Sequence, residues 1–444
     1  MTFDLSFWLQ LLVVFAAVAV GGRLGGVGLG AAGGFGVAVL VFVFGLEPSG
    51  IPVNVMLIIA AVIAATSLLE AAGGLDLFVR WAEKLLRKKP SAITFVGPVV
   101  CSFFTILVGT SYVAFALYPV VAEIAASARV RPERAVAASV VCAGTALYAS
   151  PMSASMAAMV AVMCTLDVAF WQILSITIPS FFFATFCTSL FLFRKGAELA
   201  DDPEFQRRVA TGEYKDLGEV HTKTRAQTSP MALRAVLIFF AGILLTILVG
   251  SVPGWRPSWE VAGKTVNLAV PQLIEMMMLA TGLVLILCCR IPSDKFASGA
   301  IFRSGLIGVV GIFGIAWCTG TFLNAHTALL ADSVAHIVRD APYLFCFAAF
   351  LVSSIVFSST VATTIMLPLG VKFGLSPEFL VGTWACCFGN FTIPGAAQIA
   401  CTALDRTGTT KLGSWVLNHS YMLPGLVWIL SASAAGYALS KVFI

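Results

Sequence analysis

The sequence predicts an all-α polytopic membrane protein built from two inverted-topology repeats. The first observation is composition: 59% of the 444 residues are hydrophobic, only 11% are charged, and the mean hydropathy is +0.96. The second is that apolar runs of about 20 residues, long enough to cross a hydrocarbon core, recur along the whole chain. The third is that the two halves, 1–193 and 235–444, carry Gly- and Pro-interrupted apolar segments in the same order. Paired interruptions of this kind are typical of the mid-membrane site of a secondary transporter.

In the first half, three uninterrupted apolar segments precede a hairpin, a broken helix and a closing helix. The hairpin follows Pro90, and its apolar run is interrupted at Gly109, Thr110 and Ser111. The next helix begins at Pro132 and is interrupted by the run Ser150, Pro151, Met152, Ser153. The predicted segments are 5–22, 25–45, 53–73, the hairpin 91–127, the broken helix 134–165 and the closing helix 171–193. The N-terminus lacks the positive region of a signal peptide, so we expect the first segment to be a retained span.

The second half repeats this order. Its hairpin follows Pro342 and is interrupted at Ser358, Ser359 and Thr360. A helix then begins at Pro377 and is interrupted by the run Asn390, Phe391, Thr392, Ile393, Pro394, Gly395. The predicted segments are 235–251, 270–289, 301–323, the hairpin 342–373, the broken helix 378–404 and the closing helix 415–440.

Orientation follows from the number of crossings and from charge. A hairpin returns to the side from which it entered, so each half crosses the membrane an odd number of times and the second half is inverted. With ten crossings both termini lie on one side. Placing both termini outside the cell puts 22 of the 27 Lys and Arg residues on the cytoplasmic side. Cytoplasmic loops carry an excess of these residues, so the sequence predicts that both termini face away from the cytoplasm.

Three segments are polar or amphipathic rather than spanning. The stretch 194–234 mixes acidic and basic residues without an apolar period, which favours a cytoplasmic linker between the repeats; a docking role for a regulatory partner is the alternative. The stretches 76–89 and 327–340 are amphipathic and are expected to lie along the two membrane surfaces, each supporting a hairpin.

The interruptions are the predicted substrate site. Backbone groups freed by breaking a helix inside a membrane must be satisfied by protein, water or ligand, and a restarted helix directs N–H groups and a partial positive charge at its ligand. Four such starts would suit an anion, and no Arg or Lys lies in the four clusters. For any single Ser or Thr, close helix packing is an equally good explanation. The predicted site residues are Gly109, Thr110, Ser111, Ser150, Pro151, Ser153, Ser358, Ser359, Thr360, Asn390, Thr392 and Pro394.

Two carboxylates within apolar segments, Glu70 and Glu275, are candidates for coupling to H+ or Na+, because ionisable groups in membrane spans are functional candidates by default. Their alternative role is an interhelical hydrogen bond or an interfacial position. Glu123 is nearer a span end, which favours an interfacial position.

Other classes of function have little support in the residues. A net charge of +5 does not indicate nucleic-acid binding, and no Walker-type loop indicates ATP-driven transport. The 11 cysteines and 4 histidines show no metal or catalytic spacing, so neither an enzyme nor a cofactor is expected. The remaining alternatives are a channel and a transport-linked sensor acting through the linker. A channel would need the interrupted helices to line a continuous pore, and a sensor would not need two symmetric sets of broken helices.

Several motifs resemble those of the anaerobic C4-dicarboxylate carriers, the Dcu family, along essentially the full chain. The matching runs are RLGG at 23–26, GGLDLFVRWAEKLLRKKP at 73–90, RPERAVAAS at 131–139, ASPMS at 149–153, GIAW at 314–317, DRTGTTKLG at 405–413 and NHSYMLPG at 418–425. The chain departs from the family pattern at Thr360 and after Pro394, and it has Glu70 and Glu275 where glutamine is usual. The resemblance implies a bacterial inner-membrane carrier of fumarate, malate, succinate or aspartate, with both termini in the periplasm, often an exchanger during anaerobic growth. It also implies kinship with the ion-transporter superfamily, and so a homodimeric elevator with two re-entrant hairpins; a different small organic anion on the same fold is the alternative.

The elevator divides each repeat into two parts. Because the four clusters must share one anion, their segments have to travel together, so 91–193 and 342–440 are expected to form the transport unit. The segments 5–73 and 235–323 are expected to form a static scaffold, the expected dimer interface. The glycine-rich second segment suits a tight fixed contact. Its glycines are Gly25, Gly26, Gly28, Gly30, Gly33, Gly34 and Gly36.

Overall fold

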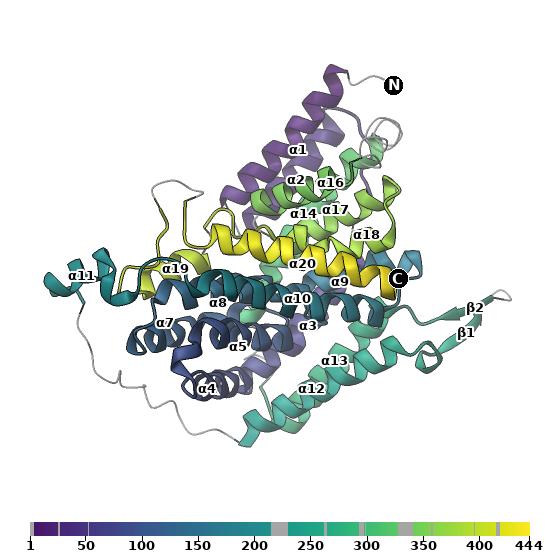
Figure 1. Cartoon of the computed structure of the whole chain (residues 1–444). Helices are drawn as coiled ribbons and strands as arrows, with labels where there is room; N and C mark the ends of the chain where they lie inside the picture. Colours follow the sequence, from purple (N-terminus) through teal and green to yellow (C-terminus); the bar gives the residue numbers. More distant parts are fainter. Residues whose placement is uncertain are drawn as a thin grey trace.

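The structure is a computed structural model that describes residues 4–24, 27–51, 53–214, 230–261, 264–292, 297, 299–326, 341–356, 358–394, 396–413 and 418–444. Six helices in these ranges are long and apolar enough to cross a membrane, or seven if α3 and α4, bent by 72° where they meet, form one span. The fold is therefore that of a mostly helical polytopic membrane protein (Figure 1). The number of ten crossings stays a prediction.

The helices of the first half follow the predicted segments closely. Their bounds are α1 Leu5–Leu24, α2 Val27–Phe42, α3 Val53–Ala71, α4 Gly74–Leu86, α5 Ile93–Val108, α6 Tyr112–Phe115, α7 Tyr118–Ser127, α8 Pro132–Thr145, α9 Ala154–Met163 and α10 Phe170–Phe193. Proline in the first turn begins α7 and α8, where its missing N–H removes no helical hydrogen bond. Helix α4 is amphipathic, with one face buried against the protein, as the sequence predicts.

The described helices of the second half also follow the predicted segments. Its bounds are α12 Pro230–Ser251, α13 Val270–Cys289, α14 Ala300–Ala325, α16 Tyr343–Val356, α17 Ser359–Lys372, α18 Pro377–Gly382, α19 Ala396–Leu404 and α20 Met422–Phe443. A 3-10 helix, Trp384–Phe388, continues α18 up to the second break. The predicted amphipathic stretch 327–340 and the residues Gly25, Gly26 and Gly395 lie outside the described ranges.

Two helix groups make up the molecule. In one group α2 packs against α14, and α3 packs against both α13 and α14. In the other, α10 packs along α20 (Figure 1), and α5 packs against α8. The contact of α2 with α14 is close enough to need glycine: a Cβ on Gly33 would lie 2.3 Å from the carbonyl carbon of Gly314. The glycine face of α2 is thus used within the chain.

Two features depart from the predicted organisation. A short antiparallel hairpin, β1 Ser258–Val261 and β2 Lys264–Asn267, precedes α13, so the chain is not purely helical; strands of four residues leave too short a pattern to detect. The first part of the predicted linker also folds: helix α11, Pro203–Ala210, is capped by Asp202, whose side chain accepts from the backbone of Glu204. The rest of the linker, 215–229, lies outside the described residues.

Candidate binding site between the helix groups

A cavity of about 350 Å³ lies where the two helix groups meet, within the size range of ligand pockets. One wall is apolar and comes from α2, α3 and α14, with Leu29, Ile59 and Ile312 among its residues. The other wall comes from the interrupted segments. It is made of Gly109, Thr110, Ser111, Ser153, Ser358 and Thr360, together with neighbouring apolar residues. The cavity wall contains no charged side chain among the residues that the structure describes. Three of the four predicted clusters therefore converge on one site.

The first hairpin tip depends on glycine. Gly109 ends α5 in the left-handed conformation, with φ of 76°, and a Cβ there would lie 2.6 Å from the carbonyl oxygen of Met152. Ser150 holds the same junction, because its hydroxyl donates to the carbonyl of Ile106 at 2.7 Å. Ser150 is fully buried and, like Pro151, is not part of the cavity wall. Its contacts support a structural role for Ser150.

The helices that restart at the cavity are capped by serine. The side chain of Ser153 accepts from the backbone N–H of Met156 at the start of α9, and that of Ser358 accepts from Val361 at the start of α17. Such caps satisfy one of the four N–H groups that lack an intrahelical acceptor. The earlier N–H groups of both helices, and their dipoles, are left beside the cavity. This arrangement favours an anion without needing a basic side chain.

Ser155 joins the two halves of the chain at this site, although it lies outside the four predicted clusters. Its hydroxyl lies 3.0 Å from the hydroxyl of Ser359 and 2.9 Å from that of Thr360, and it is fully buried. Ser359 is likewise covered, whereas Thr360 reaches the cavity. The available signal was the position of Ser155, two residues after the cap Ser153, but a lone serine in an apolar helix usually indicates packing.

The fourth cluster does not line this cavity. Thr392 donates to the carbonyl of Gly389 and accepts from Ser354 on α16, so its hydroxyl is occupied within the second break. Neither Asn390 nor Pro394 belongs to the cavity wall. His419, in the loop before α20, holds the backbone of this break: its Nε2–H donates to the carbonyl of Thr392 at 2.9 Å. Burial lowers the pKa of His419, which favours the neutral imidazole.

The two candidate coupling carboxylates lie apart from the polar wall. Glu70 accepts from the backbone N–H of Ile301 at 3.1 Å, in the first turn of α14, where a negative charge is favoured by the helix dipole. This contact corresponds to the interhelical hydrogen bond that is the alternative to coupling. Glu275 is half-buried on α13 and does not line the cavity.

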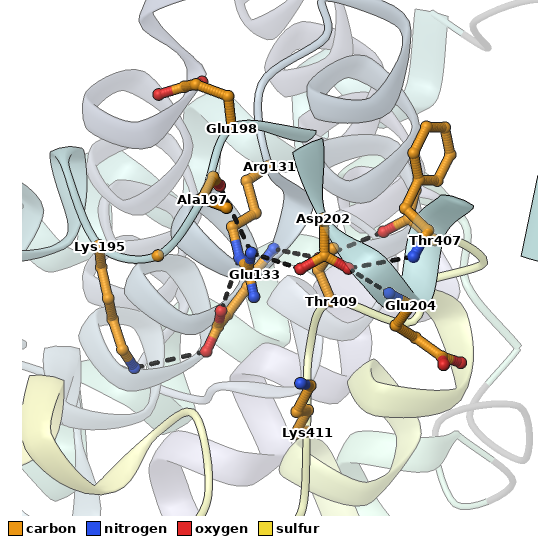
Figure 2. A network of polar contacts seen from close by, with 12 residues as sticks. Arg131, Glu133, Lys195, Ala197, Glu198, Asp202, Glu204, Thr407, Thr409 and Lys411 are labelled. Atoms are coloured by element: carbon orange, nitrogen blue, oxygen red, sulfur yellow. Dashed lines mark hydrogen bonds and ion pairs between the residues drawn. The ribbon is translucent and has the colours of Figure 1, made fainter. Parts of the chain in front are cut away.

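A second polar constellation connects α8 to the linker (Figure 2). Arg131 lies between two carboxylates: its Nε donates to Glu133 at 2.8 Å and its Nη1 donates to Asp202 at 2.6 Å. These three side chains belong to residues that are only 6%, 7% and 3% exposed. Arg134 donates to the carbonyls of Lys195 and Gly196 and pairs with Glu198. The segment 194–202 is therefore fixed against the start of α8.

The loop 405–413 joins the same constellation from the second half. Five donors from Thr407, Thr409 and Thr410 converge on the carboxylate of Asp405. The hydroxyl of Thr409 in turn accepts from the backbone of Glu133 at 3.1 Å. Because this loop directly follows α19, the last part of the second broken helix, the network joins the broken helices of the two halves.

Helix α11 adds an outer layer to this contact. Arg208 donates to the carbonyl of Arg406 at 3.0 Å and to the carboxylate of Glu204. Hydrogen bonds from Arg207 and Arg208 lower the pKa of Glu204 to about 2. The first part of the linker thus belongs to the folded body rather than to a free tether.

Comparison with known proteins agrees with this architecture. The pattern of the anaerobic C4-dicarboxylate membrane transporter family matches residues 6–444. The C4-dicarboxylate transporter DcuA of Wolinella succinogenes is 33% identical over 98% of this chain and 99% of its own. The anaerobic transporter DcuB of an Escherichia coli strain is 33% identical over the same shares.

A solved structure supports the fold alone. MtrF of Neisseria gonorrhoeae, from a class of antimetabolite efflux pumps, superposes with a TM-score of 0.51 at 16% identity, covering 92% of this chain and 85% of MtrF. The match to the family extends over residues 6–444, nearly the whole length of the chain. The chain belongs to the anaerobic C4-dicarboxylate membrane transporter family.

Proposed function

We propose that this protein carries C4-dicarboxylates, such as fumarate, malate, succinate and aspartate, across the bacterial inner membrane by exchange or cation-coupled uptake. The observation that carries the proposal is the cavity with one apolar wall and one wall of hydroxyls and helix starts. A dianion there would be held by the N–H groups of α9 and α17 and by Thr110, Ser111 and Thr360. The names of the relatives supply the substrate class.

Counterflow in proteoliposomes tests this function. We expect liposomes loaded with unlabelled succinate to accumulate labelled fumarate, and competition by malate and aspartate to exceed competition by mono- and tricarboxylates. If a different labelled organic anion accumulates and none of the C4-dicarboxylates does, the proposed substrate class is wrong. Absence of saturation, with conductance in its place, would indicate a channel.

Substitution of Thr360 tests the site. Thr360→Val removes the hydroxyl at nearly constant volume and should weaken substrate binding by about 1–3 kcal/mol, the usual penalty for an unpaired buried polar partner. Thr364→Val is the matched control, because Thr364 lies one turn further along α17, donates to the carbonyl of Thr360 and is not part of the cavity wall. Equal apparent affinities for both variants would remove Thr360 from the site.

We further propose an elevator movement of inverted repeats, with both termini periplasmic. Its support is the position of the cavity between the group containing α2, α3 and α14 and the group containing the interrupted segments. Pulsed EPR distances between labels on the two hairpins should stay constant when substrate is added, whereas the distance from either hairpin to α2 should change. An increased distance between the two hairpins, with the surrounding helices unmoved, would contradict the elevator movement. Labelling a cysteine at residue 443 from the periplasmic side checks the orientation.

A further inference from the structure

A second cavity, of about 530 Å³, lies on the outside of the molecule between α4 and α5. Its walls are apolar side chains that remain 42–48% exposed: Trp81 and Leu85 on α4, and Val99 and Phe103 on α5. Its floor is formed by Val100 and Phe104, which are buried. Because α5 is part of a candidate membrane span, Pro90–Val108, this groove opens toward the hydrocarbon of the bilayer.

Two lysines, Lys84 and Lys88, are the charged residues that line the groove. They are four residues apart, so they project from the same side of α4 and its C-terminal turn. The nearby carboxylates are already engaged, because Arg87 pairs with Glu83 at 3.1 Å and with Glu123 at 3.3 Å. In the described part of the chain neither lysine has an ion pair or a side-chain hydrogen bond. The groove therefore carries two positive charges that pair with no acidic residue in the described ranges.

The depth of the groove matches that of a lipid headgroup. The span that carries α5 begins at Pro90, so Lys88 lies just outside the hydrocarbon, where lysine side chains extend toward the interface. Trp81 is partly exposed on the same amphipathic helix, and tryptophan is enriched at this level of the membrane. The groove has positive charge at the membrane surface and apolar walls below it. This order matches the anionic headgroup and the acyl chains of a phospholipid.

We propose that this groove binds one anionic phospholipid of the bilayer. Its phosphate lies between the ammonium groups of Lys84 and Lys88, and an acyl chain lies along Val99 and Phe103. Basic pockets beside membrane helices recognise anionic headgroups in this way. The groove is connected to the binding cavity by α5, because Gly109 at the C-terminal end of this helix lines that cavity. The other helix of the groove, α4, packs against α3 and α12. The proposal concerns lipid binding and is independent of which anion is transported.

The test compares lipids on the purified full-length protein in detergent. Phosphatidylglycerol, phosphatidylcholine with the same acyl chains, or inorganic phosphate is added, and retained lipid is counted by native mass spectrometry alongside the thermal unfolding midpoint. We expect one retained phosphatidylglycerol and a raised midpoint, with little effect of phosphatidylcholine or phosphate. Lys84→Gln with Lys88→Gln should lower retention at least fivefold, whereas replacing both by arginine should preserve it.

Lys89→Gln is the matched control, because Lys89 has the same charge and neighbours Lys88 but does not line the groove. Its retention of phosphatidylglycerol should equal that of the unmodified protein. Equal retention of both lipids, or an equal loss in the Lys89 variant, would overturn the proposal in favour of non-specific lipid contact or general charge attraction. A rise of the unfolding midpoint with inorganic phosphate alone would overturn the proposal in favour of a simple anion site. None of these outcomes depends on transport activity.

Discussion

Alanine at Gly33 is expected to lower the stability of the protein by about 1–3 kcal/mol or more, the range for overpacking a well-packed interior. The added Cβ would lie 2.3 Å from the carbonyl carbon of Gly314 and 2.4 Å from the backbone nitrogen of Ile315. Both neighbours are backbone atoms of α14, so no side-chain rotation can relieve the overlap and the two helices must separate. The reciprocal change, Gly314→Ala, should be at least as severe, because its Cβ would lie 1.8 Å from the carbonyl oxygen of Gly30.

The adjacent glycine supplies the control. A Cβ on Gly34 meets nothing within 4 Å among the described residues, and alanine is the better helix former by about 1 kcal/mol. Gly34→Ala should therefore keep or slightly raise the thermal unfolding midpoint in detergent, while Gly33→Ala lowers it. Similar midpoints for the two variants would show that α2 and α14 do not pack as closely as the structure has them.

The spans were predictable because their causes are local. A membrane needs about 20 apolar residues, and proline marks helix starts; hence the predicted segment 270–289 coincides with α13, Val270–Cys289, and 53–73 nearly coincides with α3, Val53–Ala71. Interruptions are also local signals, since Gly109 and the caps Ser153 and Ser358 are residue types that end or begin helices. These three positions were predicted and lie together at the cavity.

Convergence in space was less predictable. Symmetry of the two halves suggested that four breaks share one site, yet the hydroxyl of Thr392 is satisfied inside its own break. Ser155 was missed because its partners, Ser359 and Thr360, are more than 200 residues away. The folded part of the linker was missed for the same reason, because Asp202 pairs with Arg131, 71 residues away in the sequence. By its polar composition alone this segment resembles a solvated tether.

Neutralising Asp202 should also lower the stability of the protein. In Asp202→Asn the amide oxygen can still cap α11, because asparagine is as good an N-cap as aspartate, but the negative charge facing Arg131 is lost. Arg131 is 6% exposed and would keep Glu133 as its one carboxylate partner among the described residues, together with a long hydrogen bond to the carbonyl of Ala197. Glu133 also contacts Lys195 and Ser420. Leaving a buried charge without its partner costs about 3–5 kcal/mol. We expect a lower unfolding midpoint and faster protease cleavage within 194–214.

Glu198→Gln separates this effect from a general loss of charge in the linker. Glu198 pairs with Arg134 in the same network, but its side chain is 66% exposed, and exposed pairs contribute about 0–1 kcal/mol. The carbonyls of Lys195 and Gly196 would still accept from Arg134, so the segment should stay fixed and resist protease. If the two variants lose stability and protection equally, burial of the Arg131–Asp202 pair is not what holds the linker to α8. If only Asp202→Asn loses stability and protection from protease, the Arg131–Asp202 pair is the contact that fixes the segment 194–202 to α8.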